Sequence, residues 1–491
     1  MPSITSGRDA TLLQLQYLTD SLGLRRTYLD SGVDAPERDT QDSAGKETAI
    51  DKLDCLLKPN PIRSLVQDVS RPDIEWYPNY DTHQARVERL AKSAHDRPET
   101  VPEGFPRQIV SPRVWTGSDF VDKDKYRVQL SADDIQEIRA ALEYFKGLDG
   151  DHGPGAVSTD TFPLPGLKVR LASVAQNIHR GTGFNVIRGL DPTEFSPLDN
   201  VLIYLGITSY IAEIRGCQDY DGRMIVHIKD IEKELPDASG RPSPYTNRAQ
   251  PFHTDMCDIL SMYVLDVADQ GGESLLASSA MIYNEIAATR PDIIHVLSDD
   301  RWIHDDFHKI KASWTSRPLL YNFEKHGPSF LYSRRPLTGA PFSPHRPDVP
   351  AMTEEQAEAI DAVHFTAVKH QLVIKLEPGD IEIFNNMALF HARNGFKDHG
   401  KTSEAKGVGE ARLLVQDNSG PVDRSVLRGT RHMLRLWLRS ADEELAWKTP
   451  EQLAHNSHEI YGDSEARKIE RWDVHRAPPI NRILTKHFKC S

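Results

Sequence analysis

The chain has 491 residues, 38% hydrophobic and 27% charged, which is typical of a globular protein with room for one catalytic domain and an accessory segment. The formal net charge of −13 argues against binding a phosphate backbone through net electrostatics, so no nucleic-acid partner is expected. No apolar run is long enough to cross a bilayer, so we expect no membrane partner. The N-terminus lacks a signal pattern, and the four cysteines have no paired spacing. We therefore expect a cytoplasmic protein.

Residues 1–160 are interpreted as an N-terminal extension that is partly helical and partly irregular. The stretch 34–51 is rich in Asp, Glu, Lys and small residues, so it is predicted to be a loop or a disordered segment. Helices are predicted over residues 9–24, 83–95 and 131–146. The last of these begins at Ser131, a good N-cap residue. Residues 147–166 are rich in Gly and Pro and predict a long loop.

Beyond residue 160, short apolar strands outnumber helices. Strands are predicted at 184–190, 259–267, 274–277, 372–376, 381–385 and 432–438. Helices are predicted at 167–179, 197–213, 281–297 with an interruption at Pro291, and 353–370. This pattern favours an α+β fold with a mainly β core, an antiparallel barrel or a double-stranded β-helix (jelly roll), with flanking helices. We place this domain at 161–445, with an inserted polar loop at 397–430 and a partly helical C-terminal tail at 446–491.

The motif His253-Thr254-Asp255 and the distant His391 provide candidate metal ligands. Residues i and i+2 of an extended segment point the same way, so His253 and Asp255 can converge on one ion. Either could instead belong to an ordinary polar turn, and a histidine at a strand end is often structural. The turn at 377–380 and the strand after it would hold His391 rigidly, which favours a ligand. Two imidazoles and one carboxylate are the facial triad of non-haem Fe(II) oxygenases.

Two arginines in the last predicted strand indicate an anionic ligand. Arg431 and Arg435 are four residues apart, so on a strand both side chains can enter one cavity. The guanidinium fork suits a carboxylate, and a buried arginine without an anion is costly. One or both could instead pair with an acidic residue of the protein itself. Together with a metal triad, two arginines on one face favour a dicarboxylate co-substrate.

Several motifs follow one another in order: Gly183–Leu190, Phe252–Asp255 with Cys257–Ile259, Gly271–Ser274, Gly379–Asn386 with His391–Arg393, and Arg431–Arg439. In this order they resemble the taurine dioxygenase-like family of Fe(II)/2-oxoglutarate-dependent oxygenases. The resemblance covers residues 165–440 and is greatest to a fungal branch whose members carry a long N-terminal extension and include enzymes of specialised metabolism and biosynthesis.

The resemblance implies a role for each candidate residue. It implies an Fe(II) site formed by His253, Asp255 and His391. Arg431 would receive the distal carboxylate of 2-oxoglutarate, Ser274 would donate a second hydrogen bond to it, and Arg435 corresponds to a position that meets an anionic substrate group in some relatives. About forty residues separate His391 from Arg431, which is longer than the usual spacing in the family and is explained by the insertion at 397–430.

The implied reaction is oxidation of a C–H bond of a small metabolite, carboxylate- or amino-acid-like, by hydroxylation, desaturation or oxidative cyclisation. In it, 2-oxoglutarate and O2 become succinate and CO2. Asn247, Gln250 and Asn386 lie in segments that flank the metal in such a fold, so with Arg435 they are the candidate substrate contacts. The expected partner is a small molecule, and oligomerisation is left open.

Alternative functions are weighed against the same residues. A protein-modifying member of the same barrel fold would be expected to carry reader domains or basic tails, and none is visible. A non-catalytic member would be expected to lose a metal ligand or the co-substrate arginine, yet all four residues are present. A zinc hydrolase of the HExxH type is disfavoured because the motif does not occur.

Overall fold

The structure is a computed structural model that describes residues 74–93, 97–150, 152–231, 243–306, 313–340, 343–345, 347–399 and 429–474. All of these residues belong to one compact unit, Val69–Ser491. The predicted helix at 9–24 and the acidic stretch at 34–51 lie outside the described residues, as do most of the insertion at 397–430 and the end of the C-terminal tail.

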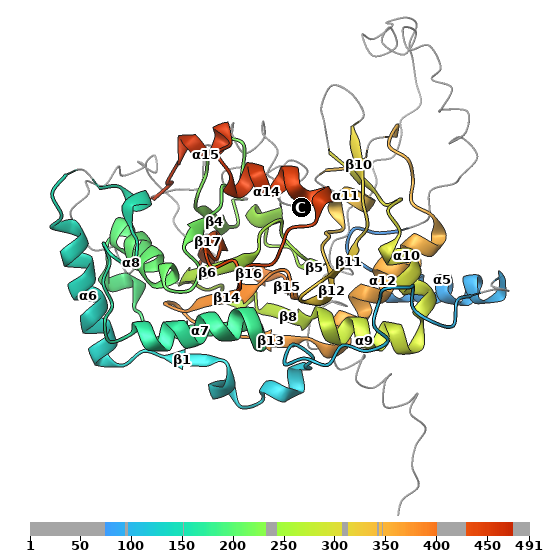
Figure 1. Cartoon of the computed structure of the whole chain (residues 1–491), viewed down its shortest axis with the longest axis horizontal. Coiled ribbons are helices and arrows are strands. Elements are labelled where there is room, and N and C mark those ends of the chain that lie inside the picture. The colour runs from blue at the N-terminus through green and yellow to red at the C-terminus, as the bar shows by residue number, and fades with distance from the viewer. Residues whose placement is uncertain are drawn as a thin grey trace, which may run out of the picture. The chain divides into compact units, whose positions relative to one another are not determined.

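The larger sheet contains seven strands. Their order is β1 (Arg127–Gln129), β2 (Phe184–Arg188), β14 (Ile381–Asn385), β6 (Ile259–Asp266), β17 (His432–Arg439) and β3 (Ile214–Arg215), with β4 (Val226–Lys229) also paired to β17. Only the β1–β2 pair is parallel among these strands, and the other pairs are antiparallel. Strands that are far apart in the sequence, such as β2 and β14, therefore lie side by side (Figure 1).

The smaller sheet is antiparallel and contains the candidate histidines. Its order is β13 (Leu372–Ile374), β8 (Ser274–Ser278), β15 (Leu389–Arg393) and β5 (Gln250–His253). One core cluster joins the two sheets, because it includes Leu260 and Phe384 of the larger sheet and Leu276 and Leu389 of the smaller one. The two sheets thus share one apolar core.

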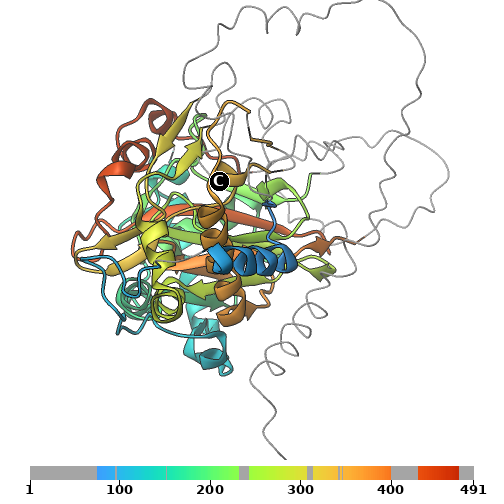
Figure 2. The same ribbon diagram turned by 90° about the vertical axis from the view of Figure 1, so that its right-hand side faces the viewer.

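Helices cover the outer face of each sheet (Figure 1). The larger sheet is covered by α6 (Ala132–Lys146), α7 (Lys168–Arg180) and α8 (Pro197–Ser209), whose apolar side chains form a second core cluster with it. The smaller sheet is covered by α9 (Ser279–Thr289), α10 (Pro291–Ser298) and α12 (Glu354–His370), which form a third cluster. Figure 2 faces this end of the molecule and shows α5 (Tyr80–Ser93) against α12.

Smaller elements complete the described part. They are the strand pairs β7 (Gln270–Gly271) with β16 (Phe396–Lys397), β9 (Ile303–Asp305) with β10 (Trp314–Ser316) and β11 (Leu320–Phe323) with β12 (Gly327–Phe330), and the helices α11 (Arg335–Thr338), α14 (Ala454–Tyr461) and α15 (Glu465–Ile469). Short 3-10 turns occur at Gly117–Phe120, Lys123–Lys125, Pro154–Ala156, Pro192–Glu194, Ser243–Tyr245 and Glu451–Leu453.

The predicted combination of a β core and flanking helices is confirmed. Ser131 caps α6 by accepting a hydrogen bond from the Asp134 amide, as expected from its sequence. Pro291 divides the predicted helix at 281–297 into α9 and α10, because proline cannot donate a hydrogen bond to the preceding turn.

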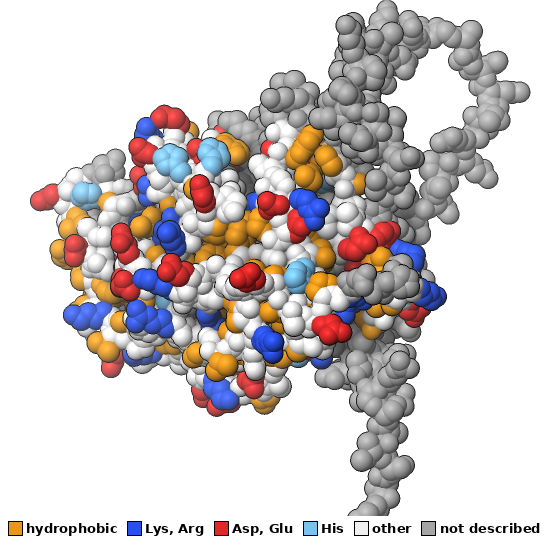
Figure 3. Space-filling model, turned by 45° about the vertical axis from the view of Figure 1, so that its right-hand side comes forward, with side chains coloured by type: hydrophobic (Ala, Val, Ile, Leu, Met, Phe, Trp, Pro, Cys, Tyr) orange, Lys and Arg blue, Asp and Glu red, His pale blue; other side chains and the backbone are white. Residues whose placement is uncertain are grey.

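Among the described residues, no helix has the length and apolar character needed to span a bilayer. Figure 3 shows acidic and basic side chains interspersed on one face.

The turn before β14 fixes the start of the strand that leads to the candidate site. Gly379 has φ +93°, and a Cβ there would lie 1.8 Å from the Leu190 carbonyl oxygen, so only glycine fits. Arg188 donates two hydrogen bonds to the Asp380 carboxylate, at 2.8 and 2.6 Å. This bidentate pair ties the turn to β2.

Candidate active site

The two candidate histidines are direct cross-strand neighbours. His253 ends β5 and His391 lies in β15, and the two residues are opposite each other in the antiparallel register. Their ring centroids are 4.1 Å apart. On its other side β15 pairs with β8, where Leu276 is the partner of His391. Because opposite residues point to the same face of a sheet, the sheet itself brings the two imidazoles together.

Asp255 lies two residues beyond β5 in a turn held by backbone contacts. The Asp255 amide donates to Asn386 Oδ1 at 2.8 Å, and Asn386 Nδ2 donates to the carbonyls of Asp255 and Cys257 at 2.8 and 2.6 Å. The Thr254 amide donates to the Tyr332 carbonyl at 2.9 Å. Asn386, predicted to contact substrate, is instead fully buried and braces this turn. The amide group of Asn386 is thus taken up by backbone partners.

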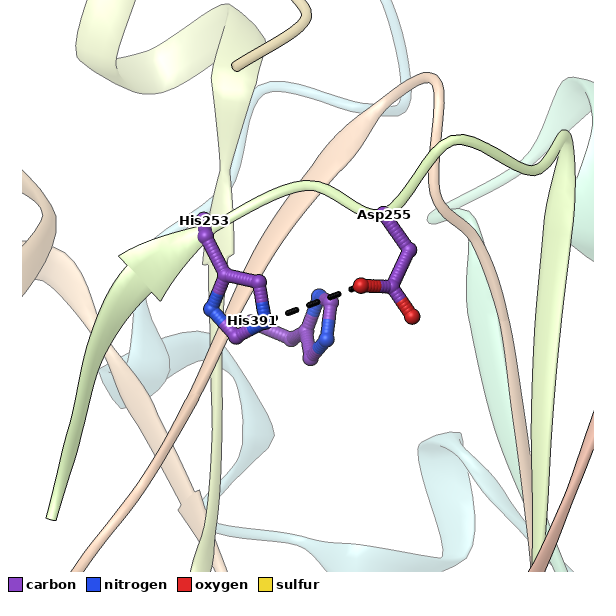
Figure 4. Close-up of side chains that lie close together, drawn as sticks. All are labelled: His253, Asp255 and His391. Carbon is purple, nitrogen blue, oxygen red and sulfur yellow. Dashed lines mark ion pairs between the residues drawn. The ribbon is translucent and has the colours of Figure 1, made fainter. Parts of the chain in front are cut away.

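The three side chains converge on one point (Figure 4). His253 Nε2 and Asp255 Oδ1 are 3.8 Å apart, and one ligand atom from each of His253, Asp255 and His391 lies within 4.8 Å of the others. Nδ1 of His253 is 2.9 Å from the Pro251 carbonyl oxygen, so it carries the proton and leaves Nε2 free. The arrangement fits one metal ion bound by two nitrogens and one oxygen.

Burial and neighbouring groups together give these three side chains the charge states that suit metal ligands. It lowers the pKa of His253 and places that of His391 well below its usual value, so both imidazoles are neutral. Burial alone would raise the pKa of Asp255, but Arg435, the two histidines and a hydrogen bond from Trp437 outweigh it and lower the pKa. The donor set is therefore two neutral imidazoles and one carboxylate.

Arg435 has its own partners inside the protein. Its Nη1 donates to Asp255 Oδ2 at 2.8 Å, and its Nε donates to Gln218 Oε1 at 2.9 Å. Trp437 Nε1 also donates to Asp255 Oδ2, at 3.1 Å. Arg435 thus pairs with an acidic residue of the chain, the alternative left open above, and because it also lines the cavity its contact with a substrate anion stays a prediction. These contacts hold one oxygen of Asp255 and leave Oδ1 facing His253.

The three candidate ligands lie in a cavity of about 550 Å³, counting the space at its open mouth. It is lined by Ile228, Ser243, Pro244, Gln250, His253, Asp255, Leu260, Met262, Ser274, His391, Ala392, Arg393, Arg431 and Arg435. Gln250 is on the wall as predicted, with its Nε2 donating to the Ser243 carbonyl at 2.8 Å. Asn247 and Asn386, both predicted to contact substrate, are not part of the lining.

Two arginines make this cavity attractive to an anion. Arg431 is 3% exposed, and its Nε and Nη1 are buried without a hydrogen-bond partner in the described part of the chain. Burial lowers the pKa of Arg431 to about 10. Arg393 donates through Nη2 to the Thr246 and Arg248 carbonyls, at 2.7 and 2.6 Å, while its Nε has no such partner. Buried N–H groups without an acceptor are costly, so a bound carboxylate that accepts from them would stabilise both side chains.

Sequence reasoning assigned no role to Arg393 or Glu382, although each left a signal. Arg393 is two residues after His391, so in a strand it shares the face of that histidine. Glu382 is an acidic residue within an otherwise apolar strand, and it is fully buried. Ser274 Oγ donates to Glu382 Oε2 at 2.9 Å, so the hydroxyl predicted to meet the co-substrate already has an acceptor.

A second, outer cavity of about 270 Å³ adjoins the first and shares Ser243, Gln250 and His253 with it. Its other walls are Trp76, Pro251, Ser333, Arg334 and Arg335. Arg334 holds this wall together, because its Nη2 donates to the Glu75 carbonyl at 2.8 Å and its Nη1 forms an ion pair with Asp361 at 2.8 Å. A segment just before α5 therefore contributes to the surroundings of His253.

Known proteins with similar sequences agree on one family. Residues 147–408 match the family described as Taurine catabolism dioxygenase TauD, TfdA family. The chain is 36% identical over 354 residues to Taurine hydroxylase-like protein SAT17 of Stachybotrys chartarum, a match that covers 71% of this chain and 83% of that protein. It is 23% identical over 293 residues to FR-33289 synthase of Streptomyces rubellomurinus, covering 56% of this chain and 74% of that protein.

The chain is less similar to solved structures. An asparagine oxygenase in complex with Fe(II), hydroxyasparagine and succinate is 12% identical, with a TM-score of 0.45 over 64% of this chain and 93% of its own. The non-haem iron oxygenase OrfP, in complex with Fe and alpha-ketoglutaric acid, is 16% identical, with a TM-score of 0.44 over 65% of this chain and 94% of its own. On the sequence matches, the chain belongs to the TauD/TfdA family and is a 2-oxoglutarate-dependent dioxygenase.

Proposed function

We propose that the chain is an Fe(II)/2-oxoglutarate-dependent oxygenase that oxidises a C–H bond of a small, carboxylate- or amino-acid-like metabolite, with conversion of 2-oxoglutarate and O2 into succinate and CO2. The observation that carries this proposal is the cluster of His253, Asp255 and His391 in a cavity that also contains Arg431, whose Nε and Nη1 have no hydrogen-bond partner among the described residues. In this interpretation, the two sheets with a common core are the two halves of a double-stranded β-helix.

The side chains present fit an iron ion. His253, Asp255 and His391 would hold it on one side and leave its remaining positions toward the cavity, as in the facial triad of Fe(II) oxygenases. When bound, iron supplies the activation of dioxygen that amino-acid side chains cannot provide. Arg435 and Trp437 keep Asp255 ionised and oriented, which fixes the carboxylate before any ligand arrives.

The co-substrate would lie at the basic end of the cavity. Arg431 has two unsatisfied N–H groups and can take the distal carboxylate of 2-oxoglutarate through a planar, charge-assisted pair of hydrogen bonds. Ser274 lines the same cavity and would donate a second hydrogen bond to that carboxylate once Glu382 no longer accepts its hydroxyl proton. Arg393 adds positive charge beside Arg431, and the pKa of Arg393 is held well below its usual value by burial and then by Arg431.

The substrate would occupy the outer cavity and reach the metal past His253. The shared residues Gln250 and Ser243 connect the two cavities, and Trp76 and Arg335 form the far wall. An aromatic face and a guanidinium group suit a small molecule that has both an apolar part and an anionic group. The similarity to a protein named as taurine hydroxylase-like supports hydroxylation of a small, amino-acid-like compound.

Succinate formation tests this proposal. The purified full chain, supplied with Fe(II), 2-oxoglutarate and O2, is expected to form succinate, with a further increase when a substrate is present. His253→Ala removes one candidate ligand and is expected to reduce succinate to the uncatalysed background. His295→Ala is the matched control, because His295 is on α10 and contacts the Thr100 carbonyl, outside the cavity. Full activity of His253→Ala would contradict the assignment of the ligands.

A further inference from the structure

Glu382 is an unusual residue for its position. It lies in β14 between Ile381 and Ile383, and its exposed fraction is 0%. One carboxyl oxygen, Oε2, accepts a hydrogen bond from Ser274 Oγ at 2.9 Å, while Oε1 is buried without a hydrogen-bond partner in the described part of the chain. An ionised carboxylate with so few partners is costly, and burial raises the pKa of Glu382 to about 7. Both protonation states are therefore populated near neutral pH.

The charged neighbours of Glu382 are few. Arg431 favours its ionised form, and Asp380, at the start of the strand, disfavours it. Tyr126 is the other titratable group that interacts with it. Its register partners on the flanking strands β2 and β6 are Val186 and Met262, which carry no charge. Glu382 and Arg431 form no ion pair with each other, so the carboxyl group does not take the place of an external anion on Arg431.

The hydrogen bond from Ser274 to Glu382 uses the only proton that the Ser274 side chain can donate. Ser274 has a single hydroxyl proton, and an ionised Glu382 can only accept it. While it does so, Ser274 cannot donate to a co-substrate carboxylate in the cavity. A protonated Glu382 reverses the hydrogen bond, because its own O–H then donates to Ser274 Oγ. The Ser274 hydroxyl group keeps its proton and can then donate it in a hydrogen bond to a group in the cavity.

We propose that Glu382 is a positioning residue for 2-oxoglutarate: in its protonated form it donates to Ser274 Oγ, so that the Ser274 hydroxyl donates to the distal carboxylate of the co-substrate. The inference rests on the proposed function and deepens it. When Glu382 starts out ionised, binding of 2-oxoglutarate takes one proton from solvent onto the Glu382 carboxylate. No other bond is made or broken, and the dianionic co-substrate binds next to a neutral rather than a negative group.

The pH dependence of binding follows with a definite sign. Because the pKa of Glu382 is raised, the protonated form dominates below about pH 7 and is lost as the pH rises further. The dissociation constant of 2-oxoglutarate is therefore expected to be level below that range. Above it, the constant is expected to increase toward roughly tenfold for each pH unit, since each binding event then requires one proton. The carboxylates of 2-oxoglutarate stay ionised throughout and do not contribute.

The test is a titration of the Fe(II)-loaded full chain with 2-oxoglutarate under anaerobic conditions between about pH 6.5 and pH 8.5. Binding is followed by the metal-to-ligand charge-transfer absorption of the chelated oxoacid. In Glu382→Gln the amide N–H donates to Ser274 at every pH, so the dissociation constant is expected to stay level and close to the low-pH value of the unmodified chain. Glu273→Gln is the matched control, since the neighbouring Glu273 bonds to Asn394 and not to Ser274. It is expected to keep the pH dependence of the unmodified chain.

The possible outcomes distinguish a failure of the role of Glu382 from a failure of the proposed function. A level pH profile for the unmodified chain, or an unchanged rise in Glu382→Gln, would overturn the role of Glu382 while leaving the proposed function intact. Absence of the absorption band in the unmodified chain would instead contradict the proposed function. Should Glu382→Gln fail to fold, proton uptake by the unmodified chain decides, measured calorimetrically in buffers of different ionisation enthalpy. About one proton per 2-oxoglutarate is expected at the upper end of the range, and none would overturn the proposal.

Discussion

At the scale of single residues, the two oxygens of Asp255 have different surroundings. Oδ2 accepts hydrogen bonds from Arg435 and Trp437, and Oδ1 faces His253. This division keeps the carboxylate ionised in a buried place and directs one oxygen to the metal position. It also distinguishes Arg431 from Arg435 by their partners. Arg435 belongs to the metal centre, and Arg431 is left for an external anion.

This division predicts different consequences for the two arginines. Arg431→Ala is expected to weaken 2-oxoglutarate binding by roughly 10- to 100-fold, because a charge-assisted hydrogen-bonded pair contributes about 1.5–3 kcal/mol. Arg435→Ala is expected to weaken Fe(II) binding by roughly 10- to 100-fold, because it removes a partner of a metal ligand. Separate equilibrium titrations with the metal and with 2-oxoglutarate distinguish the two effects. If Arg431→Ala instead weakened Fe(II) binding and Arg435→Ala weakened 2-oxoglutarate binding, the roles assigned to the two arginines would be contradicted.

At the scale of elements, the turn at 377–380 sets the position of β14 and of the residues that follow it. Gly379→Ala is expected to destabilise the fold by about 1–3 kcal/mol, because its φ is +93° and the new Cβ would meet the Leu190 carbonyl oxygen. Gly153→Ala is the control, since a Cβ there meets nothing within 4 Å and its φ of −74° is an ordinary value. Chemical denaturation measures both. Equal stability of the two variants would contradict this account of the turn.

The same scale shows how far the sequence could predict the fold. Strands such as β6 and β14 were predicted because long buried runs are visible in composition, and α6 because its capping residue and periodicity agree. The pairs β9–β10 and β11–β12 were not predicted, since they are only three or four residues long and partly exposed. Short strands depend on their pairing, which the local sequence does not encode.

At the scale of the whole molecule, the candidate site combines segments from across the chain. His253 and Asp255 were predicted from local spacing, and His391 from its strand-end context. The pairing of Arg435 with Asp255 and the bracing role of Asn386 were not predictable, because they depend on which strands become neighbours. Likewise, nothing in the sequence connects Trp76 with His253, yet both line the outer cavity. Part of the chain outside the matched family region thus helps to shape the site.

The most direct test of the central claim is the anaerobic visible absorption spectrum of the full chain with Fe(II) and 2-oxoglutarate. A site formed by His253, Asp255 and His391 next to Arg431 is expected to give a weak metal-to-ligand charge-transfer band. The band is expected to be absent in His391→Ala and retained in His295→Ala. A folded, iron-loaded chain without the band would contradict the account, because its cavity would then bind the metal without chelating the oxoacid. A band that persists in His391→Ala would contradict the assignment of the third ligand.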